Sequence, residues 1–515
     1  MSKPDSTTTS PRPAGYTALI ERYRLDAIPN WHRSLVAVSG THRIETADGS
    51  VEEVYPQKYW PGDSVGDHLE FALKYDGANL GLLAALFSVI DPDDILNYVR
   101  SKPTGKYARR VWFLFEFITG KTLPLDDLTQ GNYVDLLDPK AYYTARPGRQ
   151  IRRQRINDNL LGNAEFCPVI RRTETLNRFE QTDLSKRCQQ IVSSYSPELL
   201  KRALSYLYTK ETKSSFEIEH ITPSSTRTER FVALLQTAEK EDFCEQQRLI
   251  ELQNRIVDPR FRDADYRSSQ NYVGETVAWQ NERVHYVCPK PEDVHALMAG
   301  LIDAHQRMEK GAVSPVVHAA AIGYAFVFIH PFEDGNGRIH RFLIHNILAR
   351  RGFTPEGIMF PVSAAMLKNA TEYDASLEAF SRPIMVLVEY TLDDTGRMAV
   401  LNDVGVWYRY VDMTPQAEAL FRFIERTIDT ELVEELAFLA NYDETKRAIQ
   451  EIVDMPDRQI DLFIRFCLQN HGRLAARKRG HFDALSDQEI ARMELVVQSA
   501  YANSNMLSSR DAESS

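Results

Sequence analysis

A segment of twelve residues, from His330 to Arg341, carries most of the side chains that could act together in a reaction. It reads His-Pro-Phe-Glu-Asp-Gly-Asn-Gly-Arg-Ile-His-Arg. An imidazole with an ordinary pKa of about 6.5 is mostly neutral at pH 7 and can accept a hydroxyl proton, so His330 is a candidate general base. Asp334 supplies a carboxylate of the kind that holds Mg²⁺ on a pyrophosphate.

The glycines and arginines of this segment are suited to bind phosphate. Gly335, Asn336 and Gly337 form a turn ahead of an apolar helical pattern, and such a turn offers backbone N–H groups and a positive helix dipole. Arg338 and Arg341 share a helix face, and guanidinium groups bind phosphate with two donors at once. The alternative is a helix–turn–helix whose charges face water. It accounts for each residue singly but not for all of them in this order.

Two apolar segments must position the turn. Residues 316–329 are apolar apart from His318 and predict a buried helix that delivers His330. Pro331 prevents that helix from continuing regularly. A second helix is predicted over residues 338–350. Its buried side is formed by Phe342, Leu343, Ile344, Ile347 and Leu348.

Helical patterns dominate the rest of the chain, and strand evidence is thin. Apolar residues at three-and-four spacing predict helices over residues 69–75, 79–90, 107–119, 196–208, 294–308 and 414–439. One hairpin is predicted from residues 271–274 and 282–287. We therefore predict a mainly α fold with one small β element. The predicted regions are disordered tails at 1–14 and 503–515, a helical N-terminal region at 15–125, a loop-rich connection at 126–194, a core at 195–398 and a helical C-terminal region at 399–502.

Composition restricts the class of protein. The 515 residues include 61 Lys and Arg against 72 Asp and Glu, a formal charge of −11, which argues against a protein that coats nucleic acid or an anionic membrane. Two basic clusters, one from Arg146 to Arg155 and one from Arg473 to Arg479, could still contact nucleic acid, although a solvated or salt-bridged surface is favoured.

The five cysteines form no Cys-x-x-Cys pair. No apolar run is as long as the about 20 residues that a membrane span needs. We expect a cytoplasmic protein.

The segment from His330 to Arg341 resembles the signature of Fic-domain proteins, His-x-Phe-x-Asp/Glu-Gly-Asn-Gly-Arg-x-x-Arg, at every defined position. The resemblance extends more loosely over residues 209–398 and implies a Fic-type helical bundle. It also implies transfer of AMP from ATP, with Mg²⁺, to a Ser, Thr or Tyr hydroxyl of a protein, with release of pyrophosphate. The implied roles are His330 as base, Phe332 as packing anchor, Asp334 as Mg²⁺ ligand, Gly335, Asn336 and Gly337 as anion hole, Arg338 as phosphate ligand and Arg341 as γ-phosphate ligand.

A kinase relative in that family has Lys in the place of Gly337, so glycine here favours nucleotidyl over phosphoryl transfer.

Residues 215–219, Ser-Phe-Glu-Ile-Glu, resemble the inhibitory motif of the family, Ser/Thr-x-x-x-Glu-Gly/Asn. The resemblance implies an inhibitory helix near 209–219 in which Glu219 pairs with Arg341 and Ser215 shares the helix face. His220 stands where Gly or Asn is usual. Because histidine adopts the left-handed conformation at greater steric cost, a different helix end is predicted.

Further expectations follow from the resemblance. The hairpin occupies the place of a target-binding flap, where a protein substrate adds a strand. Asn369 and Tyr373 lie where relatives hold the nucleoside, although their spacing alone favours core or surface positions. A homodimer and self-modification are compatible with the family, and no membrane partner is expected. The alternatives are removal of AMP from a modified protein, with Glu219 aligning a water, and an ATP-sensing regulatory or DNA-binding protein.

Four other histidines have no assigned role. His295 and His305 lie in a helical pattern and are interpreted as satisfied histidines without a companion carboxylate at metal-ligand spacing. His340 and His345 have no defined role in the signature and are interpreted as packing or supporting groups.

Overall fold

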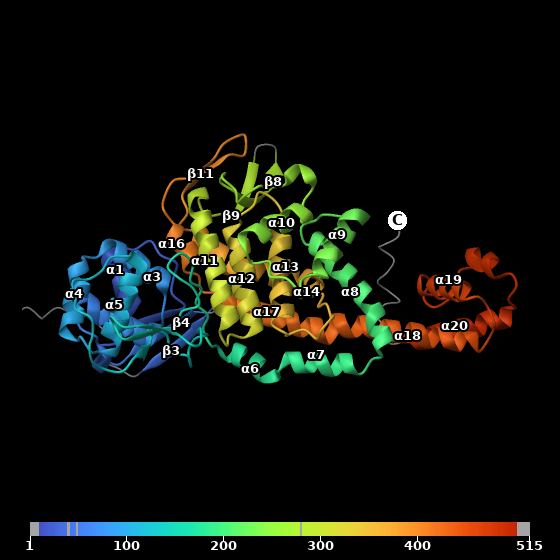
Figure 1. The fold of residues 1–515 in the computed structure, drawn as a ribbon, viewed down its shortest axis with the longest axis horizontal. Helices are drawn as coiled ribbons and strands as arrows, with labels where there is room; N and C mark the ends of the chain where they lie inside the picture. Colours follow the sequence, from blue (N-terminus) through green and yellow to red (C-terminus); the bar gives the residue numbers. More distant parts are fainter. Residues whose placement is uncertain (1–9, 39–41, 48–49, 279–280, 502–515) are drawn as a thin grey trace, which may run out of the picture.

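The computed structural model describes residues 10–38, 42–47, 50–278 and 281–501. Helices account for most of these residues and strands are short, which confirms the mainly α prediction. The molecule is elongated, with the N-terminal part at one end, a helical core in the middle and C-terminal helices at the other end (Figure 1). Residues 1–9 and 502–515 of the predicted tails lie outside the described residues. Within the first predicted tail, strand β1 (Arg12–Pro13) and the buried Ala14 are ordered parts of the fold.

The N-terminal part contains the predicted helices and also a sheet that was not predicted. The strand order is β1-β2-β4-β3, with β2 (His32–Val36) parallel to β4 (Ser50–Tyr55) and β3 (Arg43–Ala47) antiparallel to β4. The strands were missed because β3 is polar and exposed and β4 has two adjacent glutamates, so neither shows a clear alternation of apolar residues. The helices are α1 (Gly15–Tyr23), η1 (Gln57–Tyr59), α2 (Val65–Phe71), the π-helical η2 (Ala72–Asp76), α3 (Leu80–Val89), α4 (Pro92–Ser101) and α5 (Lys106–Thr119).

The region predicted to be loop-rich holds a small sheet and two helices. The sheet has the order β5-β7-β6, built from β5 (Val134–Asp135), β6 (Arg149–Ile151) and β7 (Ile156–Asp158). Helices α6 (Glu174–Thr182) and α7 (Leu184–Ser193) run beneath the core in the view of Figure 1.

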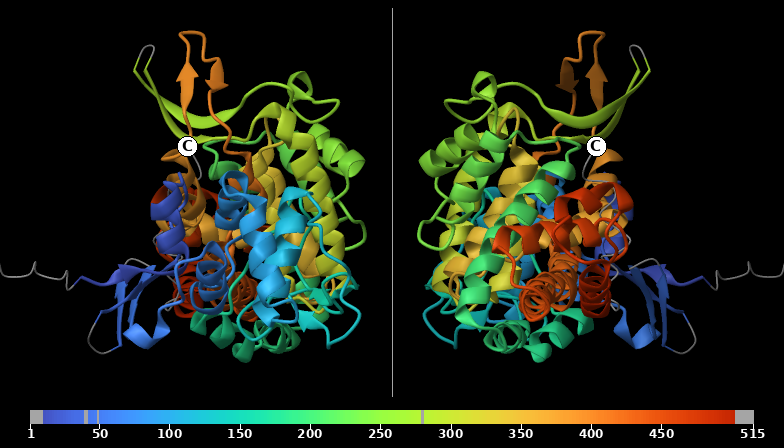
Figure 2. Two further views of the ribbon diagram at one scale, coloured as in Figure 1. Left: turned by 90° about the vertical axis from the view of Figure 1, so that its left-hand side faces the viewer. Right: turned by 90° about the vertical axis from the view of Figure 1, so that its right-hand side faces the viewer.

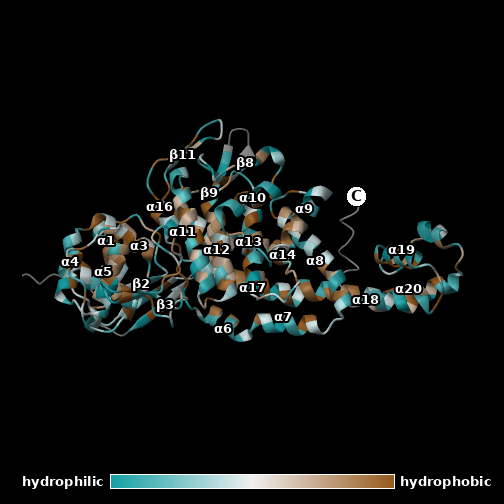
Figure 3. Cartoon of the chain, viewed as in Figure 1, coloured by the Kyte–Doolittle hydropathy of each residue, from teal (hydrophilic) through white to brown (hydrophobic). Residues whose placement is uncertain are grey.

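The core surrounds one almost completely buried helix, α12 (Pro315–Ile329). Because α12 is apolar on all sides, it has to be enclosed by other helices. It packs against α11 (Pro291–Lys310), α13 (Asn336–Arg350) and α17 (Thr414–Arg426), and its hydrophobic colouring stands out at the centre of Figure 3. The other core helices are α8 (Pro197–Glu217), α9 (Ser225–Leu235), α10 (Gln246–Ile256), η3 (Pro259–Phe261), α14 (Val362–Lys368) and α15 (Ala370–Met385).

Two hairpins project from the same side of this core (Figure 2). The first pairs β8 (Tyr272–Ala278) with β9 (Asn281–Val287) in antiparallel fashion, as predicted. The second, β10 (Tyr390–Leu392) with β11 (Met398–Val400), was not predicted. Its strands have only three residues each, too few to show a period.

The C-terminal helices belong to two different hydrophobic cores. Residues 417–439 contribute to the main core, which therefore extends past the predicted limit at residue 398. A separate small core begins at Ile449 and ends at Tyr501. The elements here are α16 (Gly405–Arg409), α17, the π-helical η4 (Thr427–Leu432), α18 (Val433–Gln450), α19 (Asp457–Leu468), η5 (Ala476–Phe482) and α20 (Asp487–Tyr501). None of the helices within the described residues has both the length and the apolar character needed to cross a membrane.

Candidate active site

His330 is the residue at which α12 ends. Its backbone is left-handed, with φ 52° and ψ 59°, and its N–H donates to the Phe326 carbonyl at 2.9 Å. The ring atom Nδ1 lies 3.0 Å from the Val327 carbonyl oxygen. Because a carbonyl only accepts, Nδ1 carries the proton and Nε2 keeps a free lone pair. Burial lowers the pKa of His330 to about 4, so the ring is a neutral proton acceptor at pH 7.

The 330–335 loop, residues His330 to Gly335, is closed by the side chain of Asn336. Its Oδ1 accepts from the Phe332 N–H at 3.0 Å and its Nδ2 donates to the Phe332 carbonyl at 2.7 Å. Phe332 is fully buried, as expected of a packing anchor. Gly335 precedes α13 with a φ of 92°, a conformation that favours glycine. The loop thus leads directly into the N-terminus of α13, whose first backbone N–H groups have no helical carbonyl partner.

Glu219 contacts both arginines of the segment. Its Oε2 lies 2.8 Å from Arg338 Nε, and its Oε1 lies 2.7 Å from Arg341 Nη2. Arg341 also donates to Ser215, from Nε to the hydroxyl oxygen at 2.9 Å and from Nη2 to the carbonyl oxygen at 2.6 Å. Both guanidinium groups are buried, whereas Glu219 is about a quarter exposed. The pairing expected with Arg341 is present, and the additional pairing with Arg338 was not anticipated.

Glu219 is not within a helix but lies just beyond one, because α8 ends at Glu217 and Ile218 is its C-cap. The N–H of His220 donates to the Glu217 carbonyl, and the N–H of Ile221 donates to the Phe216 carbonyl. These two bonds are those of a Schellman motif with His220 in the left-handed position, at a φ of 55°. The prediction of a different helix end was therefore wrong. The histidine adopts the conformation that Gly or Asn would adopt.

Replacing His220 by asparagine is expected to stabilise the protein by about 1 kcal/mol, because asparagine tolerates the left-handed conformation better than histidine does. His220 is exposed, so no buried contact is lost. The melting temperature measured by calorimetry checks this. The variant Glu217→Gln, at the preceding exposed position, serves as a control, and a lower melting temperature for His220→Asn would contradict the assignment of strain.

These groups line one cavity of about 880 Å³, bounded by the 330–335 loop, the β8–β9 hairpin and α15. The predicted residues that line it are His330, Asp334, Gly335, Asn336, Gly337, Arg341, Glu219 and Tyr373. Arg338 and Ser215 lie behind this surface, in contact with the lining residues Glu219 and Arg341. Asn369 is not brought to the cavity, because its amide donates to the Ala365 carbonyl at 2.8 Å between α14 and α15. The volume falls within the range of sites that hold small molecules.

Gly337 is the point of closest approach between the turn and Glu219. A Cβ atom at this position would lie 2.5 Å from Glu219 Oε1, which is inside the contact distance of the two atoms. Only glycine therefore lets this carboxylate rest against the first turn of α13.

Comparison with known proteins agrees with this geometry. Residues 242–348 match the model of the Fic/DOC family. These residues are therefore similar to a Fic domain. A protein named Protein adenylyltransferase Fic from Drosophila willistoni is 34% identical over 153 residues, which is 28% of either chain. A protein of the same name from Nematostella vectensis is 38% identical over 95 residues, 18% of this chain and 20% of the relative.

The chain thus spans less than a third of the length of these curated relatives. Among solved structures, a Fic family protein from Desulfovibrio desulfuricans has 19% sequence identity and a TM-score of 0.36, over 64% of this chain and 90% of the other.

A buried glutamate links helix α13 to α8, and the sequence analysis missed it. Glu211 is fully buried and accepts from the backbone N–H of Ser363 at 2.9 Å and from the hydroxyl of the same residue. His345 Nε2 lies 2.7 Å from Glu211 Oε1. His345 thus lies against a buried carboxylate, which fits the supporting role considered for it, and His340 is buried between the rings of Tyr324 and Tyr373. The sequence did hold a signal for Glu211. It is an acidic residue four positions before Ser215, on a helix face that is otherwise buried.

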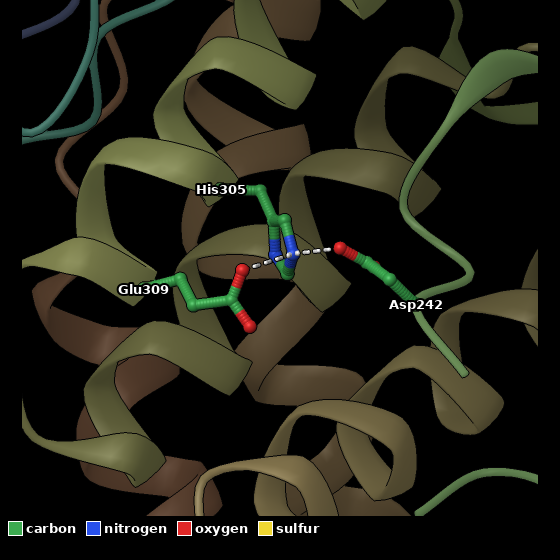
Figure 4. A group of neighbouring side chains, drawn as sticks. All are labelled: Asp242, His305 and Glu309. Carbon is green, nitrogen blue, oxygen red and sulfur yellow. Dashed lines mark hydrogen bonds and ion pairs between the residues drawn. The ribbon is translucent and has the colours of Figure 1, made fainter. Parts of the chain in front are cut away.

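His305 does have companion carboxylates, contrary to the sequence analysis. Its Nε2 lies 3.3 Å from Asp242 and 3.9 Å from Glu309 (Figure 4). Arg350 pairs with both carboxylates, at 3.1 and 2.6 Å. The arginine offsets one of the two carboxylate charges, and the group therefore has the character of a salt-bridge network. His305 also contacts His318, twelve residues before His330 and so about 18 Å away along α12.

Part of each basic cluster is used inside the molecule, whereas Arg146, Arg149, Arg152, Arg473 and Arg477 are exposed. Arg153 pairs with Glu116 and Asp127, and Arg155 donates to backbone carbonyls of residues 128–131. Arg479 donates to the Phe482 and Leu485 carbonyls and pairs with Asp487. These contacts fit the salt-bridged interpretation for Arg153 and Arg479.

Proposed function

We propose that this protein is a protein adenylyltransferase that transfers AMP from Mg–ATP to a Ser, Thr or Tyr hydroxyl of a protein. The observation that carries the proposal is the joint position of three groups on one cavity: the neutral His330, the Gly335–Gly337 turn at the start of α13, and Arg341. The curated relatives named Protein adenylyltransferase Fic support the same reaction.

The residues can be assigned to the steps of this transfer. His330 Nε2 accepts the proton of the target hydroxyl while the hydroxyl oxygen bonds to the α-phosphorus of ATP. The bond from this phosphorus to the bridging oxygen of the β-phosphate breaks, and pyrophosphate leaves. The N–H groups at the start of α13 and the guanidinium of Arg341 bind the charged oxygens. Such a displacement needs mainly positioning and charge neutralisation.

Asp334 is suited to hold the metal ion of Mg–ATP. Its carboxylate lines the cavity, is nearly half exposed, and uses only Oδ1 for the contact with Arg338 Nη2 at 2.7 Å. The oxygen Oδ2 is therefore available to a hard cation. A Mg²⁺ ion held there would neutralise charge on the triphosphate.

Glu219 is proposed to inhibit the reaction, because it places a carboxylate on the two arginines that would otherwise receive phosphate. Holding a site 99% closed requires only about 2.7 kcal/mol. One charge-assisted hydrogen bond to Arg341 and one ion pair with Arg338, both buried arginines, are of sufficient strength.

The hairpin is proposed to receive the protein substrate. β8 and β9 form a two-stranded sheet within the described residues, so an extended segment of a target can pair with the outer edge of β8. Val273 on β8 is 42% exposed, and several hairpin residues line the cavity that holds His330. Backbone pairing selects little for sequence, which leaves the identity of the target to experiment.

ATP labelled at different phosphorus atoms tests the reaction. With the Glu219→Gly variant and a cell lysate, protein is expected to retain label from α-labelled ATP and none from γ-labelled ATP. Transfer from the γ position would identify a kinase instead. An absence of label from both forms of ATP would reject transferase activity.

Removal of AMP from a modified protein is the second candidate, since the Glu219 carboxylate lines the cavity together with His330 and could align a water. The two reactions respond oppositely to Glu219→Gly, which should release transfer and abolish removal. An ATP-sensing DNA-binding role is less favoured, because the chain has a formal charge of −11 and Arg153 and Arg479 are held by internal contacts.

A further inference from the structure

A buried arginine outside the signature, Arg267, joins the 330–335 loop to the base of the hairpin. It is 3% exposed. Its Nε donates to the His330 carbonyl at 2.7 Å, and its Nη2 lies 3.4 Å from the Ile329 carbonyl. Its own backbone N–H donates to the Pro331 carbonyl at 2.8 Å. Three consecutive carbonyl groups around the proposed base thus accept from one residue.

The same guanidinium holds both ends of the hairpin. Nη1 donates to the Ser269 carbonyl at 2.7 Å, just before β8, and Nη2 donates to the Pro289 carbonyl at 2.6 Å, just after β9. We call residues 267–271 and 288–289 the hairpin stem. A planar fork with five N–H donors can reach all of these carbonyls at once, which an ammonium group cannot do.

Arg267 forms no ion pair with any other described residue, as is also true of the buried Arg109 and Arg110. Arg338 and Arg341, by comparison, are both paired with carboxylates. Burying a cation without a carboxylate is costly. Here hydrogen bonds to backbone carbonyl oxygens alone offset this cost. The guanidinium therefore fixes the positions of these backbone segments and does not balance a negative charge.

Two further bonds run between the stem and the loop. The hydroxyl of Ser269 donates to Glu333 at 2.5 Å, and Asn271 Nδ2 lies 3.4 Å from the Phe332 carbonyl. The hairpin and the loop are therefore connected at several points, with the Arg267 side chain at the centre of the connection.

We propose that Arg267 is a positioning residue that holds His330 and the β8–β9 hairpin in one rigid frame, so that a hydroxyl on a segment bound to the hairpin reaches Nε2 of the base. The proposal rests on the proposed AMP transfer. Arg267 forms no hydrogen bond or ion pair with the Gly335–Gly337 turn or with Arg341. In this proposal, the turn and Arg341 therefore bind the nucleotide independently of Arg267.

The test uses Arg267→Lys and Arg267→Gln in the full chain carrying Glu219→Gly. Both variants are expected to lower kcat/KM for the protein target by about 100-fold, the cost of a misplaced reacting group. The dissociation constant for ATP should stay within about threefold of the parent, since the phosphate-binding groups are unchanged. Arg262→Lys is the matched control. This exposed arginine lies five residues before Arg267 and donates to only one carbonyl, that of Asn254. Its kcat/KM should not change.

A spectroscopic measurement keeps the proposal testable if no transfer is found at all. The ¹⁵N shifts of His330 should show a single tautomer with the proton on Nδ1 in the parent, and averaging between tautomers in both Arg267 variants. Variants that retain the single tautomer and the parental kcat/KM would overturn the proposal.

If the Arg267 variants fail to fold, Ser269→Ala carries the test. It removes one bond between stem and loop and should lower kcat/KM for the target several-fold with unchanged ATP affinity. An unchanged kcat/KM for this variant would contradict the proposal that a rigid connection between the hairpin and His330 is needed for transfer.

Discussion

The variant Glu219→Gly is expected to transfer AMP about 100-fold faster than the wild-type protein, the gain from opening a site that is 99% closed. The physical reason is the double contact of this carboxylate with Arg338 and Arg341, at 2.8 and 2.7 Å. Without the carboxylate, Arg338 keeps its pair with Asp334 and Arg341 keeps its bonds to Ser215, so both guanidinium groups remain in place to receive phosphate.

The measurement is the initial rate of labelling with α-labelled ATP in a lysate, followed by mass spectrometry of the labelled proteins. Glu217→Gly is the matched control, because it removes an exposed carboxylate from the last residue of α8 and should leave the rate unchanged. Equal rates for the wild type and Glu219→Gly would show that this carboxylate does not restrain the enzyme.

The variant His330→Ala, made together with Glu219→Gly, is expected to lose transfer by about 10²- to 10⁴-fold, the usual contribution of a general base. ATP binding should persist, because the turn before α13 and Arg341 are untouched. Single-turnover rates and ATP titrations of the same samples separate the two effects. His295→Ala, which removes an exposed imidazole from α11, is the control. Retention of the full rate by His330→Ala would assign the proton acceptor elsewhere.

The pH dependence of the Glu219→Gly variant follows from the same residue. Burial lowers the pKa of His330 to about 4, and only the neutral ring accepts a proton. The rate should therefore not depend on His330 ionisation near pH 7. It should fall as the pH drops through about 4 and the ring becomes protonated.

Several features of the site followed from local sequence. The apolar run of α12, the proline after His330 and the glycine turn before α13 are adjacent in the chain, and helix ends depend mainly on neighbouring residues. The end of α8 illustrates the limit of this reasoning. A residue preference argued against a left-handed His220, yet His220 adopts that conformation just after Glu219, which pairs with Arg338 and Arg341.

What the sequence alone determined was the inventory of the candidate site and the order of its helices: a base, a turn, two arginines and an acidic motif upstream. Only the tertiary structure decided that Glu219 contacts both arginines, that Asn369 faces its own helix end, and that Arg267 joins the hairpin to the loop of His330. The reason is that these contacts link residues far apart along the chain. Nothing in the spacing of residues specifies which distant backbone carbonyls a buried guanidinium will meet.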